Sequence, residues 1–92
     1  MNEFESIWDR IRKHVGETFT TKTGLDFTFD VPGAYLRITR DGHEIERSLS
    51  KTNFAKAVPM LPADGPGALK ARQGASYTWA ILMDERIRRG QW

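Results

Sequence analysis

Apolar and polar residues alternate from residue 25 to residue 49, and this pattern leaves few folds open to the chain. A period of two is typical of strands that have one buried face and one solvated face. Two turn signals, Pro32-Gly33 and Asp41-Gly42, interrupt the alternation. The pattern therefore predicts an antiparallel meander of three or four strands. The predicted core face of this sheet carries Phe27, Phe29, Leu36, Ile38 and Ile45.

The two turn signals differ in what they predict. Asp-Gly between alternating runs is typical of a two-residue hairpin loop. Such a loop would pair Ile38 with Ile45, Arg37 with Glu46 and Thr39 with Glu44. Pro-Gly favours a type II turn, whose twist suits a tight hairpin poorly, so a longer loop is an open alternative there. A two-residue loop at this point would pair Phe29 with Leu36 and Phe27 with Ile38.

A helix is predicted before the sheet, after which a short strand covers residues 18–21. Asn2 is placed to cap the helix, and Gly16 follows as a stop signal. Residues at spacings of three and four form one apolar stripe, which we expect to pack on the sheet. The stripe consists of Phe4, Ile7, Trp8, Ile11 and Val15.

Two further helices are predicted after the sheet. The first begins at Ser50 as its cap, with Leu49 and Phe54 placed for a hydrophobic staple, and Pro59 limits it. Residues 59–75 form a long irregular stretch, in which a short helical turn at residues 68–72 is possible. The last helix covers residues 76–89, with Ser76 as cap and Gly90 as stop. The sequence thus predicts a single α+β domain over residues 1–92.

Composition excludes several classes of function. The 92 residues include no cysteine, which excludes disulfides, thiolate metal sites and a cysteine nucleophile. The chain has no apolar run of about 18 residues, so we expect no membrane span. It also opens without the basic and apolar start of a signal peptide. The absence of cysteine makes a cytoplasmic protein the default expectation.

No catalytic or metal-binding constellation is visible in the sequence. His14 and His43 lack the paired spacing of a metal site, so we expect neither a metal nor a cofactor. The carboxylates of the polar sheet face are interpreted as solvated partners of Arg37 and its neighbours; they are Asp26, Asp30, Glu44 and Glu46. A small enzyme is the second alternative, in which residues 59–75 would close over His43 or over these carboxylates.

The positive charge of the chain lies near its C-terminus. Residues 17–49 hold six acidic and four basic residues, whereas residues 69–92 hold five basic and two acidic ones. The candidate binding residues are Lys70, Arg72, Arg86, Arg88, Arg89 and Trp92. Trp92 has no obvious core partner in the sequence, and exposed aromatic residues are typical anchors of interfaces.

These residues support two binding hypotheses. The leading one is a non-enzymatic module that binds a protein partner or a second copy of itself through residues 59–75 and the C-terminal residues. The alternative is a nucleic-acid-binding module, in which the basic residues meet a phosphate backbone. The acidic outer face of the sheet, without a stacking pair of aromatic residues, disfavours the alternative.

Two patterns in the chain resemble a group of small bacterial proteins. They are Phe19-Thr-Thr-x-x-Gly24-x-x-Phe27, and Ser76-Tyr-x-Trp-Ala-Ile-Leu82 followed by Asp84-x-Arg-Ile87. The chain is similar in this to uncharacterised proteins of the kind that mobile gene cassettes encode. The resemblance implies no catalytic residue. It implies that Ser76, Tyr77, Trp79, Asp84 and Arg86 form one structural unit, in which Asp84 and Arg86 hold the last helix against the preceding loop.

Overall fold

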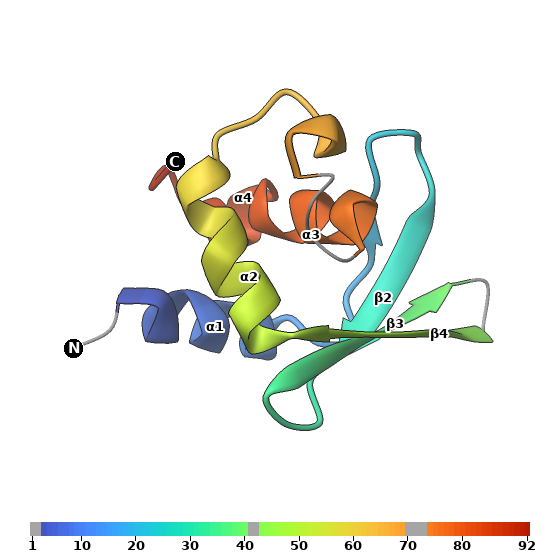
Figure 1. Ribbon diagram of the computed structural model, residues 1–92. Coiled ribbons are helices and arrows are strands. Elements are labelled where there is room, and N and C mark those ends of the chain that lie inside the picture. The colour runs from blue at the N-terminus through green and yellow to red at the C-terminus, as the bar shows by residue number, and fades with distance from the viewer. Residues whose placement is uncertain (1–2, 41–42, 70–73) are drawn as a thin grey trace.

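The computed structural model describes residues 3–40, 43–69 and 74–92. Helix α1 (Glu3–Lys13) precedes the strands β1 (Phe19–Thr20), β2 (Asp26–Asp30), β3 (Tyr35–Arg40) and β4 (His43–Ser50). The strands form one antiparallel sheet in the order β1-β2-β3-β4. After the sheet come α2 (Lys51–Ala57), the 3-10 helices η1 (Val58–Met60) and η2 (Pro66–Leu69), then α3 (Ala75–Leu82) and α4 (Glu85–Arg88). The predicted α+β fold is confirmed, with four strands in the meander (Figure 1).

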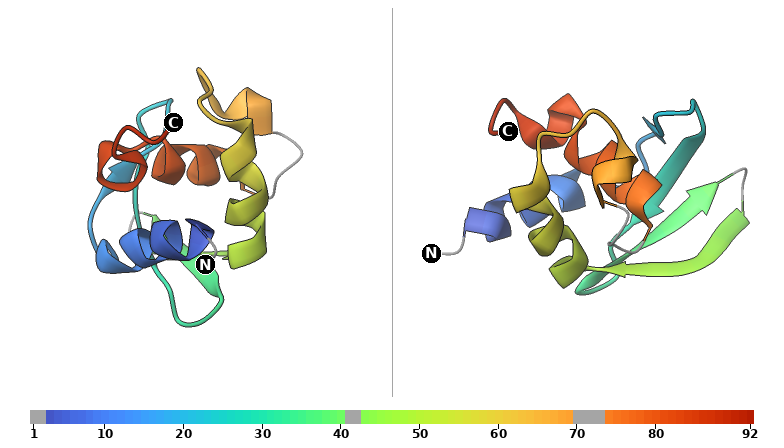
Figure 2. Two further views of the ribbon diagram at one scale, coloured as in Figure 1. Left: turned by 90° about the vertical axis from the view of Figure 1, so that its left-hand side faces the viewer. Right: turned by 45° about the horizontal axis from the view of Figure 1, so that its top comes forward.

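The helices and the sheet share one apolar core. Figure 2 (left) shows α1, α2 and α3 with α4 around a common centre, with the sheet behind them. On the sheet, Phe27, Phe29, Leu36 and Ile38 are at most 2% exposed, as predicted. The side chain of Ile45, the fifth predicted member of this face, lies outside the described residues. The apolar residues of the alternating pattern are therefore buried on one face of the sheet, and this is why a period of two predicts strands here.

Helix α1 packs on this core through the predicted stripe, with one exception. Phe4, Ile7, Trp8 and Ile11 are buried, whereas Val15 is 44% exposed. The helix ends at Lys13, and Gly16 adopts a φ of 82°. The Gly16 N–H donates to the carbonyl of Phe29 at 3.0 Å, so the chain has already turned toward the sheet before the stripe can continue. The predicted cap, Asn2, lies outside the described residues.

The β2–β3 connection takes the longer of the two predicted forms. The pairs are Thr28 with Thr39, Phe29 with Ile38 and Asp30 with Arg37, so the pairing that a two-residue loop would give is wrong. Residues 31–34 make the turn, in keeping with the poor fit of Pro-Gly to a tight hairpin. The register differs from the tight alternative by two residues, which leaves every side chain on its predicted face.

The β3–β4 hairpin begins in the predicted register and then departs from it. Thr39 pairs with Glu44, and Arg40 pairs with His43, as a two-residue loop requires. The predicted pairing of Arg37 with Glu46 is wrong, because an irregularity between Arg37 and Thr39 shifts Arg37 to Ser48. Such bulges insert extra residues into one strand and bend it.

Helix α2 begins as predicted. The Ser50 hydroxyl accepts a hydrogen bond from the Asn53 N–H at 3.0 Å, which satisfies one of the free donors of the first helical turn. Leu49 and Phe54, the predicted staple, are both fully buried. Pro59 ends the α-helix, and the chain continues as η1.

The predicted last helix is two helices. Helix α3 begins at Ala75 with Gly74 as its cap, so the expected cap at Ser76 is wrong. It ends at Leu82, since Asp84 takes an extended conformation and caps α4 by accepting from the Arg86 N–H at 2.9 Å. Aspartate is among the best helix caps, and here it starts a new helix inside an otherwise helical pattern.

Residues 58–69 rest on α3. The Trp79 indole N–H donates to the Ala63 carbonyl at 2.9 Å, and Leu69 at the end of η2 is fully buried. A short helical turn is present, but it covers residues 66–69 instead of beginning at residue 68. Residues 70–72 of the predicted turn lie outside the described residues. The part of this segment that the structure describes is therefore anchored to the core.

Candidate binding surface

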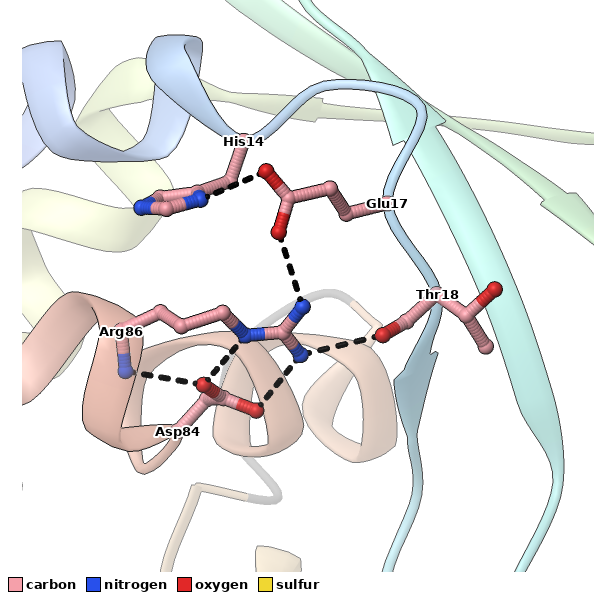
Figure 3. A network of polar contacts seen from close by, with 5 residues as sticks. All are labelled: His14, Glu17, Thr18, Asp84 and Arg86. Atoms are coloured by element: carbon pink, nitrogen blue, oxygen red, sulfur yellow. Dashed lines mark hydrogen bonds and ion pairs between the residues drawn. The ribbon is translucent and has the colours of Figure 1, made fainter.

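Arg86 is the centre of a polar network that joins α4 to the segment before β1 (Figure 3). Its guanidinium donates to both carboxylate oxygens of Asp84, at 2.8 and 2.9 Å. It also donates to a carboxylate oxygen of Glu17 at 3.1 Å and to the carbonyl of Thr18 at 3.0 Å. His14 Nδ1 lies 2.8 Å from the other Glu17 oxygen. We call these five residues, His14, Glu17, Thr18, Asp84 and Arg86, the Arg86 network.

The charges of the Arg86 network compensate each other. The hydrogen bond from Arg86 lowers the pKa of Asp84, although partial burial opposes it. The pKa of Glu17 is lowered, first by His14 and further by Arg86. The guanidinium carbon of Arg86 also lies 3.7 Å from the centre of the Phe19 ring. Because Asp84, Glu17, Thr18 and the Phe19 ring all contact its guanidinium group, we interpret Arg86 as a structural residue.

The network corrects the unit implied by the resemblance. Asp84 and Arg86 do pair, and among the described residues Arg86 joins α4 to Thr18, whereas residues 70–73 of the loop before α3 lie outside the described residues. The Tyr77 hydroxyl accepts from Arg40 at 2.9 Å, and the Trp79 indole donates to Ala63. The aromatic residues of the pattern thus make their polar contacts elsewhere.

The other predicted binding residues are distributed over different surroundings. Arg88 donates to the carbonyl of Trp92, and its Nε lies 3.9 Å from a Glu85 oxygen. Arg89 is exposed. Lys70 and Arg72 lie outside the described residues. The three arginines therefore have different surroundings: Arg86 pairs with two carboxylates, Arg88 contacts Trp92 and Glu85, and Arg89 is exposed.

Trp92 has a core partner, which corrects the expectation of a free aromatic residue. Its indole N–H donates to the Leu82 carbonyl at 2.7 Å, and its ring packs against the apolar core. The side chain is only partly buried, because one side of it lines a hollow between α1, α2 and η1. Trp92 is thus a fixed wall of a surface depression.

This depression, which we call the apolar groove, has a volume of about 290 Å³. Most of its lining side chains are aliphatic or aromatic, the amide of Gln91 being the exception, and they come from residues far apart in the sequence. The groove is lined by Phe4, Ile7, Ala55, Val58, Leu61 and Trp92, together with Pro59 and Gln91. No stripe in the sequence predicts the groove, since its residues meet only in the folded chain.

A second hollow, which we call the basic hollow, adjoins the apolar groove at Gln91, which lines both. Its volume is about 360 Å³, and its charged residues are Arg10, Lys13, Arg89 and Asp9. The pKa of Arg10 is lowered, first by burial and then by the charge of Arg89. The sequence indicated Arg89 as a binding residue but not Arg10 and Lys13. Cations are common in the last turn of a helix, where they interact favourably with the helix dipole, so these two gave no sign of a binding role.

A third hollow, of about 660 Å³, lies between Lys22, residues 60–68 and Arg88. The Lys22 ammonium group donates to the Asp64 carbonyl at 2.6 Å. Its ionisable lining residues are Lys22, Asp64 and Arg88, which do not include a base placed beside a nucleophile. This hollow therefore gives no basis for assigning a reaction.

Two of the carboxylates on the polar face of the sheet, those of Asp30 and Asp26, have hydrogen-bond partners on neighbouring strands. Arg37 pairs with Asp30 at 2.9 Å and lowers the pKa of that carboxyl group by hydrogen bonding, as the interpretation of a solvated face requires. Asp26 accepts from the Thr20 hydroxyl at 2.8 Å. The side chains of His43, Glu44 and Glu46 lie outside the described residues, so the enzyme alternative has no described contact in its favour.

Two further features, a metal-ligand cluster and a membrane-spanning helix, are absent from the described residues. Among the side chains that the structure describes, which exclude those of residues 3 and 43–47, there is no cluster of three or more potential metal ligands. Within residues 3–40, 43–69 and 74–92, no helix has the length and apolar character needed to cross a membrane. Comparison of the chain with protein-family models, curated proteins and solved structures found no significant match.

Proposed function

We propose that the chain is a non-enzymatic binding module that holds an apolar segment of a partner protein in the apolar groove. The observation that carries this proposal is the lining of the groove, whose side chains are aliphatic or aromatic except for that of Gln91, while the indole N–H of Trp92 is already bonded to the Leu82 carbonyl. Apolar pockets beside well-packed aromatic residues are typical positions of interface anchors. Trp92 and Phe4 provide such walls here.

The size of the groove favours a side-chain anchor over a small-molecule ligand. Its volume of about 290 Å³ lies at the lower limit of ligand pockets, which span roughly 300–1,000 Å³. Ligand pockets also carry several polar groups that orient the ligand. A groove with one amide side chain matches one or two apolar side chains of a protein segment better than it matches a metabolite.

The test is a selection of peptides from a displayed random dodecapeptide library on the immobilised chain. Groove variants Val58→Glu and Ala55→Glu place a charge in the apolar lining, and Ala55 lies on a helix where glutamate is well tolerated. Val15→Glu is the matched control, because Val15 is 44% exposed and does not line the groove. Circular dichroism of each variant verifies that it is folded.

We expect selected peptides to contain adjacent apolar residues, to bind the wild type and Val15→Glu, and to lose binding to both groove variants. Peptides that bind the folded groove variants equally well would refute the proposal, as would the absence of any enrichment. Light scattering after size-exclusion chromatography tests self-association. A homodimer that dissociates in Val58→Glu would show that a second copy, and not another protein, occupies the groove.

A further inference from the structure

Given the proposed function, we propose that the partner segment carries aspartate or glutamate beside its apolar anchor. These carboxylates would pair with Arg10, Lys13 and Arg89 in the basic hollow. The inference thus names the chemistry of the partner: an acidic segment with an adjacent apolar pair.

The first support is that the two hollows are neighbours on the same helix. Ile7 lines the apolar groove and Arg10 lines the basic hollow, and residues three apart on a helix are adjacent on its surface. Gln91 lines both hollows. Residues three apart on a helix have Cβ atoms about 5–6 Å apart, and an extended peptide advances about 3.3 Å per residue, so roughly two residues of a peptide span the step from Ile7 to Arg10.

The second support is the charge of the basic hollow. Among the described side chains that line this hollow, three are cationic and one, that of Asp9, is a carboxylate, which already lies 3.8 Å from Arg12. Arg10 donates to the amide oxygen of Gln91, a neutral acceptor, and its buried Nε has no hydrogen-bond partner within the part of the chain that the structure describes. The pKa of Arg10 is lowered, first by burial and then by the charge of Arg89, which agrees with cations that lie close together.

Arg86 is an arginine of the same chain whose charge is compensated by two carboxylates, and it serves as a comparison for the basic hollow. It pairs with Asp84 and Glu17, which raise its pKa. Lys13 and Arg89 have no such ion pair among the described residues. A carboxylate from a partner would form ion pairs with the cations of the basic hollow, as Asp84 and Glu17 do with Arg86.

An acidic peptide suits this surface better than a nucleic acid. Nucleic-acid binding neutralises several successive phosphates and uses a basic stripe or groove. Here the cations stand in one hollow of about 360 Å³, and the adjoining surface is apolar. Apolar anchors flanked by complementary charges at the rim are a common arrangement in protein interfaces.

The test uses the double variant Lys13→Gln/Arg89→Gln, which removes two charges from the basic hollow and no ion pair of the described residues. Lys56→Gln is the control, because Lys56 is exposed on α2 and lines neither hollow. Peptides enriched in the selection described above are synthesised, and their Kd values are measured by fluorescence polarisation at low and moderate salt.

We expect the enriched peptides to carry an excess of aspartate and glutamate. The double variant should bind them roughly 5- to 30-fold more weakly at low salt, with a smaller difference at moderate salt. Lys56→Gln should match the wild type. Peptides without acidic excess, or with equal affinity for the double variant, would refute this inference while binding lost in Val58→Glu still supports the apolar groove.

Two other results have different meanings. If selected peptides bind Val58→Glu and Ala55→Glu as well as they bind the wild type, the proposed function itself is wrong. Mixed single-stranded DNA and RNA fragments serve as competitors in the same assay. If they displace the peptides from the wild type and bind the double variant weakly, the basic hollow recognises phosphates and the acidic partner is refuted.

Discussion

Replacing Arg86 with methionine should destabilise the chain by about 2 kcal/mol. The variant keeps an apolar stem over Phe19 but loses the two bonds to Asp84, the bond to the Thr18 carbonyl and the bond to Glu17, whose carboxylate is exposed and to which we assign no stability. Hydrogen bonds to charged groups contribute ~1.5–3 kcal/mol when buried, but the Arg86 side chain is 34% exposed and is screened by solvent. We therefore assign ~1 kcal/mol to the Asp84 pair and ~1 kcal/mol to the Thr18 bond and the ring contact together.

The assay is urea unfolding followed by circular dichroism, with thermal melting as a second measurement. For a domain of this size, a loss of 1 kcal/mol lowers Tm by about 4–8 °C, so Arg86→Met should melt roughly 8–16 °C below the wild type. Arg12→Met is the matched control. Arg12 is 60% exposed and lies 3.8 Å from Asp9, so its loss should change stability by less than ~0.5 kcal/mol. Equal stabilities of the two variants would refute a structural role for Arg86.

The effect of Arg86→Met should depend on pH. The folded-state pKa values of Asp84 and Glu17 are lowered, so their contribution is fully present above the unfolded-state values of about 3.9 and 4.3. It is lost as pH falls through the lower folded-state values. The difference in unfolding free energy between wild type and variant should be constant from pH 7 to about pH 5 and should narrow at more acidic pH. A difference that stays constant at acidic pH would show that these ion pairs contribute little.

Two further substitutions test local features of the fold. Ser50→Ala should cost about 1 kcal/mol, because it removes the acceptor for the Asn53 N–H; urea unfolding measures this, and an unchanged midpoint would contradict the cap. Gly74→Ala and Gly90→Ala form a matched pair, since both glycines have a positive φ, of 58° and 77°. A Cβ at position 74 would lie 2.7 Å from a methyl carbon of Leu49, whereas position 90 has no heavy atom within 4 Å of its Cβ. Gly74→Ala should therefore melt well below Gly90→Ala, and equal melting temperatures would show that Leu49 moves aside without cost.

The fold was predictable because its main signals are local. The alternation of period two and the apolar stripe of the first helix depend on residues close together in sequence. The mistakes arose where local signals compete. The apolar run of residues 77–83 favours one long helix. Aspartate is among the strongest helix N-caps, however, and Asp84 ends this run by capping a new helix, α4. The strand irregularity opposite Arg37 has no sequence signal that we can identify.

The binding surface was less predictable because its parts are far apart in the chain. The sequence placed Arg86, Arg88 and Arg89 in one basic region, but Glu17, which pairs with Arg86, is 69 residues away. In the same way, Arg10 and Arg89 share a hollow only because the end of α4 lies beside α1. Charge counted along a sequence cannot show which charges are already compensated in the folded chain.

The Arg86 network and the proposed binding surface are connected through α4. The network fixes the start of this helix, and the residues after its end provide Arg89, Gln91 and Trp92 to the two hollows. Arg86→Met should therefore weaken peptide binding together with stability, because it loosens the element that carries these three residues. Lys13→Gln/Arg89→Gln should weaken binding with little change in Tm, since neither side chain has an ion pair among the described residues. Measuring Tm and Kd on the same variants separates these two roles: if Arg86→Met lowers Tm while Kd is unchanged, the binding surface does not depend on how α4 is held.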